Sequence, residues 1–140
     1  MARERRHARI LAMQALSQWD TQHDESLANL HELLTVLCEN GAGFDYAFEL
    51  ITAFWSQREK IDGLIGQAAT KWDISRISLV ERNAMRVAVV EMLSGKAPPK
   101  VALHEAVEIG DEFGGGDSPR FINGVLDAVL HRIDAEAARP

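Results

Sequence analysis

Four arginines lie within the first nine residues of the chain: Arg3, Arg5, Arg6 and Arg9. Guanidinium groups bind the phosphates of nucleic acids, through contacts that weaken as salt is added. Only one acid, Glu4, accompanies them, so residues 1–9 carry +3, whereas the whole sequence carries −6 and the remainder therefore −9. This balance argues against nucleic-acid binding over the whole surface. It leaves a small basic arm on an acidic body.

A second set of candidate residues follows the glycines at 114–116. The segment Asp117-Ser118-Pro119 is typical of a helix start, and exposed amides at such a start can bind a phosphate. Arg120 and Phe121 come next, and an aromatic ring beside an arginine at an accessible helix start suits stacking on an RNA base. Two simpler interpretations stay open, a plain turn for the glycines and a place at the edge of the core for Phe121.

Catalytic and metal-binding motifs are incomplete. His104-Glu105 begins like a zinc-protease helix, but the residue four positions after His104 is Glu108, so the second histidine ligand is missing. Cys38 is the only cysteine and lies beside leucines, as a small buried hydrophobe would. The remaining acids are scattered as on solvated helix faces. We therefore expect no enzymatic activity, no metal site and no cofactor.

Helical periodicity runs through the chain, and the period-two alternation of strands is nowhere sustained. The first helix has a single apolar stripe from Ala8 to Trp19, and Arg5, Arg6 and Arg9 lie in or before its first turns. Cations at a helix N-terminus oppose the helix dipole, so this cluster calls for an outside partner or is accidental. Further helices are predicted at about 26–39, from 45 to about 68 with or without a break before 61, and at 78–93, 100–113 and 119–133.

Several helix boundaries have clear signals. Ser78 and Glu81 form a capping box, Ser94-Gly95 should end the helix that follows, and Asn40-Gly41 should end the second helix. Asn123-Gly124 would indicate a hairpin if taken alone, but the helical period on both sides overrules it. A glycine inside a helix costs about 1 kcal/mol relative to alanine, so close packing or close approach of a ligand is expected there.

These elements predict an all-α fold of about seven helices in a single domain. The seam lies between residues 70 and 77, which separates two small helical subdomains of about 1–70 and 71–134 that share one core. No apolar run approaches the roughly 18 residues of a membrane span. Together with the single cysteine, this predicts a cytoplasmic protein.

Four stretches, taken in order, make the chain resemble the NusB family. They are Arg5 to Arg9 leading to Gln14-Ala15-Leu16, and residues 80–86, 100–108 and 117–127. The last is the most specific, because it places Asn123-Gly124 inside an amphipathic helix after a polar cap. The resemblance implies two packed three-helix bundles and a non-enzymatic role. Members bind boxA RNA together with NusE, a ribosomal protein, and act with RNA polymerase in transcription antitermination, notably on ribosomal RNA operons.

By position, the resemblance implies roles for individual residues. Arg5, Arg6 and Arg9 would belong to an arginine-rich RNA-binding motif, Asp117 and Phe121 to the RNA-facing surface, and Glu81 to the side that faces NusE. Arg120 joins the RNA-binding candidates through its place beside Phe121. The sequence departs from the family at Ser17, where tyrosine is frequent, at Ala128, where lysine is usual, and at His7, which interrupts the arginines.

Three alternatives remain. The chain could be a helical protein-interaction module that binds no RNA. It could be the isolated N-terminal domain of an RNA cytosine methyltransferase, since those enzymes use the same module, although 140 residues leave no room for their catalytic domain. It could also form a homodimer that hides the RNA surface, because the family contains both monomers and dimers.

Overall fold

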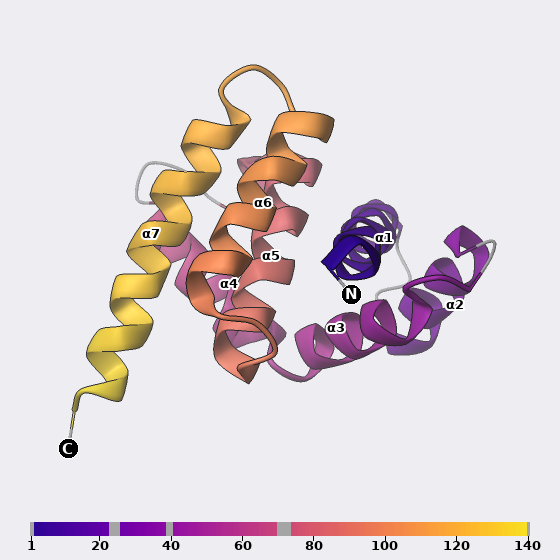
Figure 1. The fold of residues 1–140 in the computed structure, drawn as a ribbon, viewed down its shortest axis with the longest axis horizontal. Coiled ribbons are helices and arrows are strands. Elements are labelled where there is room, and N and C mark those ends of the chain that lie inside the picture. The colour runs from indigo at the N-terminus through magenta and orange to yellow at the C-terminus, as the bar shows by residue number, and fades with distance from the viewer. Residues whose placement is uncertain (1, 23–25, 39–40, 70–73, 140) are drawn as a thin grey trace.

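A computed structural model describes residues 2–22, 26–38, 41–69 and 74–139. Within these residues the chain forms seven α-helices and one short 3-10 turn at Ile74–Arg76, and no strand (Figure 1), which confirms the all-α prediction. The helices are α1 (Ala2–Asp20), α2 (Leu27–Leu37), α3 (Phe44–Ser56), α4 (Arg58–Ala68), α5 (Leu79–Ser94), α6 (Pro99–Phe113) and α7 (Ser118–Ala137).

The helices pack around α1 and α5. α1 lies against α2 and α3 on one side and against α5 on the other, and Figure 1 shows it nearly end-on between them. α6 packs between α5 and α7, while α4 packs mainly on α7 and α5. The division into subdomains near residue 70 stays a prediction, and residues 70–73 at its seam lie outside the described residues. The structure adds that α4, which precedes that seam, contacts the helices that follow it.

The apolar stripes predicted from periodicity form the core. In α1 every residue of the predicted stripe is buried: Ala8, Leu11, Ala12, Ala15, Leu16 and Trp19. α5 is buried on all sides, with ten consecutive buried residues at 83–92. A helix enclosed in this way has no solvent-facing side for polar residues. Asn83, Arg86 and Glu91 therefore lie inside the protein.

Most helix boundaries follow the sequence signals. At the start of α5 the Ser78 hydroxyl accepts a hydrogen bond from the amide of Glu81. At its end Gly95, with φ +70°, has the left-handed conformation that favours glycine. α2 ends at Leu37, and Asn40 lies outside the described residues. The predicted break before residue 61 falls at Gln57, between α3 and α4.

Of the two explanations offered for Gly124, close packing is wrong, and close approach of a ligand stays a prediction. A Cβ atom on Gly124 would meet nothing within 4 Å, so close packing inside the protein does not explain this glycine. The tight approach of α6 to α7 occurs at Gly110, where a Cβ atom would lie 2.5 Å from Ile122. The helical period places Phe113 on the same side of its helix as Ala102 and Ala106, which are buried, but Phe113 is 38% exposed. No helix among the described residues is long and apolar enough to cross a membrane.

Candidate nucleic-acid interface

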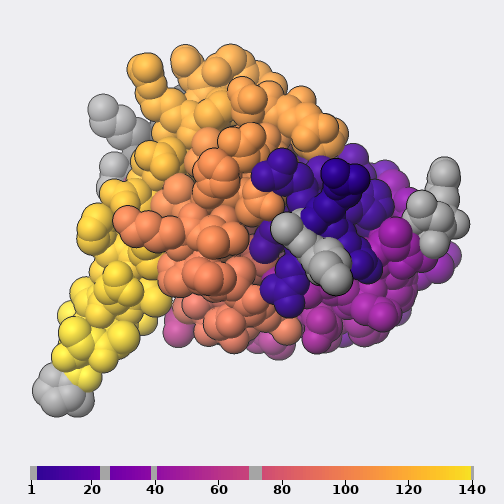
Figure 2. Space-filling model, viewed as in Figure 1, coloured from indigo at the N-terminus to yellow at the C-terminus, as the bar shows by residue number. Residues whose placement is uncertain are grey.

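The side chains of Arg6 and Arg9 meet on one carboxylate. Nε and Nη2 of Arg6 donate to the two oxygens of Glu105 at 3.3 and 2.6 Å, and Nη1 of Arg9 donates to Oε1 of the same residue at 3.0 Å. Figure 2 shows the N-terminal residues in indigo, bordered by the orange residues of α6 that carry this carboxylate. The Arg6 side chain is 49% exposed, whereas that of Arg9 is only 5% exposed.

Arg9 is held by a second, fully buried carboxylate. Its Nε donates to both oxygens of Glu91, at 2.9 and 3.0 Å, and the side chain of Glu91 is 0% exposed. The hydroxyl of Tyr46 donates to the same carboxylate. Burial lowers the pKa of Arg9, but the hydrogen bond and negative charge of Glu91 outweigh it, so the pKa is raised overall. The guanidinium of Arg9 therefore faces buried carboxylates and not the solvent.

Arg5 is also engaged, but at the surface. Its Nη1 donates to the carbonyl oxygen of Lys96 at 3.0 Å, and its guanidinium lies 4.6 Å from the centre of the Tyr46 ring. Arg3 and Arg5 are exposed. The basic arm is thus ordered as the first turns of α1, and its outer side chains remain open to an approaching phosphate.

The sequence left an outside partner or accident as the explanation of this cluster, and for Arg6 and Arg9 the structure has partners inside the chain instead. The carboxylate partners of Arg6 and Arg9 are Glu91 and Glu105, which come from α5 and α6 of the same chain. Both were expected on solvated helix faces and both are buried. Sequence reasoning missed them because the side of α5 that carries Glu91 packs against α1 and α3 instead of facing water. His104 is exposed, 3.7 Å from Glu108, in keeping with a surface residue.

The second set of candidates lies at the start of α7. Asp117 is the N-cap residue and is exposed, but its side chain makes no capping hydrogen bond. Arg120 is exposed. Phe121 is half-buried and packs against the core, so the expected position at the core edge is what the structure has. The residue as a whole keeps some exposed surface. Pro119 is the second residue of the helix, not the first.

Glu81 ties the start of α7 to the start of α5. Its Oε1 accepts a hydrogen bond from the Ser78 hydroxyl at 2.9 Å, and its Oε2 accepts one from the Ser118 hydroxyl at 2.7 Å. The return bond of a capping box, in which the Ser78 amide donates to the Glu81 carboxylate, is replaced by these two hydroxyl bonds. A carboxylate offers about four acceptor sites. Glu81 therefore keeps capacity for a partner.

An apolar groove lies between α1, α2, α5 and α6, and its lining includes Val80, the residue before Glu81. It has a volume of about 400 Å³. Its lining includes Met13, Gln14, Ser17, Gln18, Leu37, Val80 and Phe113. The exposed ring of Phe113 is explained by this position, since it forms a wall of the groove.

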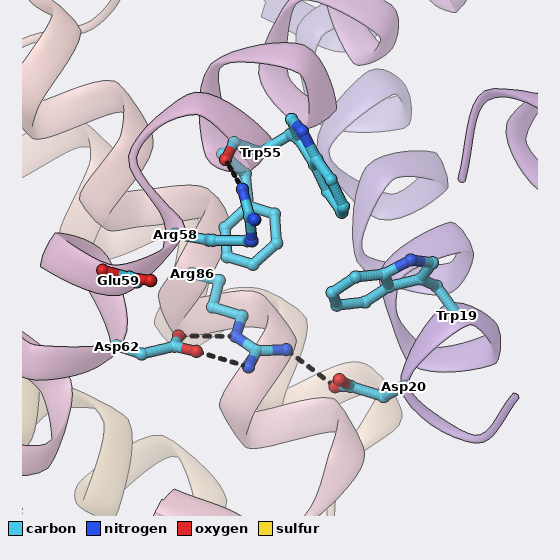
Figure 3. A pocket seen from close by; sticks show the side chains of 8 residues that line it. Trp19, Asp20, Trp55, Arg58, Glu59, Asp62 and Arg86 are labelled. Carbon is cyan, nitrogen blue, oxygen red and sulfur yellow. Dashed lines mark hydrogen bonds and ion pairs between the residues drawn. The ribbon is translucent and has the colours of Figure 1, made fainter. Parts of the chain in front are cut away.

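A further network at the other end of α1 has no counterpart in the sequence-based predictions. Arg86 lies between Asp62 and Asp20, with three contacts of 2.8 Å, as Figure 3 shows. Arg82 donates to the same oxygen of Asp20 at 3.1 Å. The network borders a cavity of about 300 Å³, where the guanidinium of Arg58 stacks 3.9 Å above the ring of Trp55.

The described residues hold no group of three or more His, Cys, Asp or Glu side chains placed to bind a metal ion. The candidate binding features are the outer arginines of α1, the start of α7 with Glu81, and the apolar groove.

Comparison with known proteins identifies the family. A sequence model of the NusB family matches residues 6–131. The transcription antitermination protein NusB of Desulfotalea psychrophila is 43% identical over 132 residues, which cover 89% of this chain and 94% of that protein. The NusB of Dehalococcoides mccartyi strain 195 is 36% identical over 130 residues, which cover 92% and 91%.

Solved structures agree with the sequence comparison. NusB of T. maritima has a TM-score of 0.81 and 31% identity, covering 91% of this chain and 90% of its own. A chain from the complex of antitermination factors NusB and NusE with double-stranded RNA has a TM-score of 0.81 and 29% identity, covering 94% and 99%. The chain belongs to the NusB family, and the resemblance inferred from its motifs is confirmed.

Proposed function

We propose that this NusB-family chain is a transcription antitermination factor that binds boxA RNA together with NusE. It acts with RNA polymerase, notably on ribosomal RNA operons, and therefore in the cytoplasm. The observation that carries the proposal is the likeness over 94% of the chain to a chain of the NusB–NusE–RNA complex. The role is one of binding and requires no catalytic group.

The RNA surface is proposed to combine the outer arginines of α1 with the start of α7. Arg5 and Arg6 are exposed there and can contact phosphates, as can Arg120. Phe121 offers a ring for base stacking, and the Asp117 carboxylate can accept a hydrogen bond from a base amino group. Arg9 supports this surface from within, because its ion pairs with Glu91 and Glu105 fix the first turns of α1 against α5 and α6.

NusE is proposed to dock on the groove beside Glu81. The groove has apolar walls in Leu37, Val80 and Phe113, and Glu81 follows Val80 directly in the chain. A carboxylate at the rim of an apolar groove suits a partner with a basic residue beside an apolar one. The net charge of −6 favours a basic partner as a whole.

Fluorescence anisotropy with labelled boxA RNA and a scrambled RNA, each with and without NusE across a salt series, tests the proposal. We expect boxA-selective binding that strengthens with NusE and weakens with salt. Arg120→Ala should weaken it, whereas Arg132→Ala, with the same charge change on the same helix, should not. Equal binding of the two RNAs under every condition would overturn the proposal and favour a protein-interaction module. Light scattering on the same samples reports whether a homodimer forms and competes with RNA.

A further inference from the structure

We propose that Glu105 sets the RNA affinity of this protein by occupying Arg6, so that an RNA phosphate must displace the carboxylate to bind. The inference rests on the proposed RNA-binding function and deepens it. It assigns a role to Glu105, an acidic residue of α6 that contacts two arginines of α1.

The Arg6–Glu105 pair has the geometry that a phosphate would copy. Arg6 presents Nε and Nη2 side by side to two carboxylate oxygens, at 3.3 and 2.6 Å. Guanidinium groups bind two phosphate oxygens through the same parallel pair of hydrogen bonds. Because the Arg6 side chain is half exposed, a phosphate can reach these donors without opening the core. The carboxylate and an RNA phosphate therefore compete for one set of donors.

Arg9 cannot make the same exchange. Its side chain is buried, and its Nε is committed to Glu91, which has no exposed surface. Withdrawing Arg9 would leave a buried carboxylate without its cation, which is strongly destabilising. Of the two arginines that share Glu105, only Arg6 is able to leave.

The exchange leaves the carboxylate of Glu105 with one of its two cations. When Arg6 turns outward to a phosphate, Oε1 of Glu105 keeps the hydrogen bond from Nη1 of Arg9, at 3.0 Å. Glu105 thus has a cationic partner in both states. The cost of releasing Arg6 is the loss of one ion pair, whose arginine side chain is 49% exposed and whose carboxylate side chain is 11% exposed.

The neighbouring acids of α6 provide the matched control. Glu108 and Glu112 lie on the same helix as Glu105 and act on Arg6 through charge, without a hydrogen bond to it among the described residues. Glu105→Gln and Glu112→Gln remove the same charge from the same helix. Only the first removes the competitor for the Arg6 donors.

The test measures boxA and scrambled RNA affinity for these two variants, for Arg6→Gln and for the double variant Arg6→Gln/Glu105→Gln, after circular dichroism confirms folding. We expect Glu105→Gln to bind about three- to tenfold more tightly than Glu112→Gln at low salt. The double variant should bind no more tightly than Arg6→Gln. Equal affinities of Glu105→Gln and Glu112→Gln, or a gain that persists without Arg6, would overturn the inference.

A direct reading comes from the arginine Nε–H resonances of the wild-type protein during titration with boxA RNA. The Arg6 signal should shift and the Arg9 signal should stay. An unshifted Arg6 signal at saturation refutes the exchange while leaving the proposed function intact. Loss of boxA selectivity in every variant refutes the proposed function, and the comparison of Glu105→Gln with Glu112→Gln still decides the inference on either RNA.

Discussion

The two ends of α1 are each tied to α5 by arginine–carboxylate pairs, but with opposite polarity. At the N-terminal end α1 supplies the cation, Arg9, and α5 supplies Glu91. At the C-terminal end α1 supplies the anion, Asp20, and α5 supplies Arg82 and Arg86. Cations at a helix start and anions at a helix end both oppose the helix dipole. Asp20, the last residue of α1, therefore carries a charge that its own helix does not stabilise, whereas Arg9 lies in the third turn of α1, beyond the reach of the dipole.

The two ends differ in what remains accessible. Arg86 is 7% exposed, and its guanidinium is shared between Asp20 and Asp62. At the other end the buried pair of Arg9 and Glu91 is extended outward by Glu105 and Arg6, and Arg6 is half exposed. The C-terminal network ends in Asp62, whose side chain is 31% exposed, while the N-terminal network ends in Arg6, which is 49% exposed. Both networks hold helices together, but the first ends in an anion, whereas the second ends in a cation that can bind a phosphate.

The largest effect on stability is expected from breaking the C-terminal network of Arg86, Asp20 and Asp62. Arg86→Met leaves Asp62 without its cation and Asp20 with Arg82 alone, and we expect the free energy of unfolding to fall by about 3 kcal/mol. Urea unfolding followed by circular dichroism measures this loss. Arg76→Met is the matched control, because Arg76 is exposed in the 3-10 turn. If Arg86→Met costs no more than the control, the network does not stabilise the fold.

The sequence predicts the helices and the apolar core because both depend on residues close together in the chain. The stripe from Ala8 to Trp19 and the capping serine Ser78 carry their information locally, and the structure has both. The pair of Arg9 and Glu91 joins residues 82 positions apart, so local patterns do not contain it. The arginines at the start of α1 did signal an absent partner, but nothing in the sequence shows whether that partner is internal or external.

The candidate site divides in the same way. Asp117, Arg120 and Phe121 follow from a helix start and an aromatic residue, and their exposure depends on how α6 turns into α7. The hydrogen bond from Ser118 to Glu81 could not be predicted from the sequence, because it depends on how closely the starts of α5 and α7 approach each other. The burial of Glu91 could have been predicted from the composition of α5. Arg86 and Glu91 interrupt an otherwise apolar run there without forming a polar face.

An intermediate effect is expected from the fixed centre of the N-terminal network. Tyr46→Phe removes the hydroxyl that donates to Glu91, a carboxylate with no access to water that could replace the bond. We expect the free energy of unfolding to fall by about 2 kcal/mol, the range for a hydrogen bond to a charged group. The same urea titration measures it. An unchanged stability would mean that the bonds from Arg9 are sufficient for Glu91. The N-terminal network would then depend on fewer contacts than the C-terminal one.

The smallest effect is expected from acid, which acts on Glu105. Burial raises the pKa of this carboxyl, but the hydrogen bond and charge of Arg6 and the charge of Arg9 outweigh it, so the pKa lies below its ordinary value of 4.5. A carboxyl whose pKa is lowered on folding stabilises the protein above pH 4.5, and this contribution is lost as pH falls through the folded-state pKa. Because Arg6 is half exposed, we expect roughly 0.5 kcal/mol. Urea unfolding between pH 7 and pH 3 should show the wild type losing its advantage over Glu105→Gln below about pH 4.5. A constant difference across that range would mean that Glu105 acts through packing and not through charge, which would remove the basis for an exchange with phosphate.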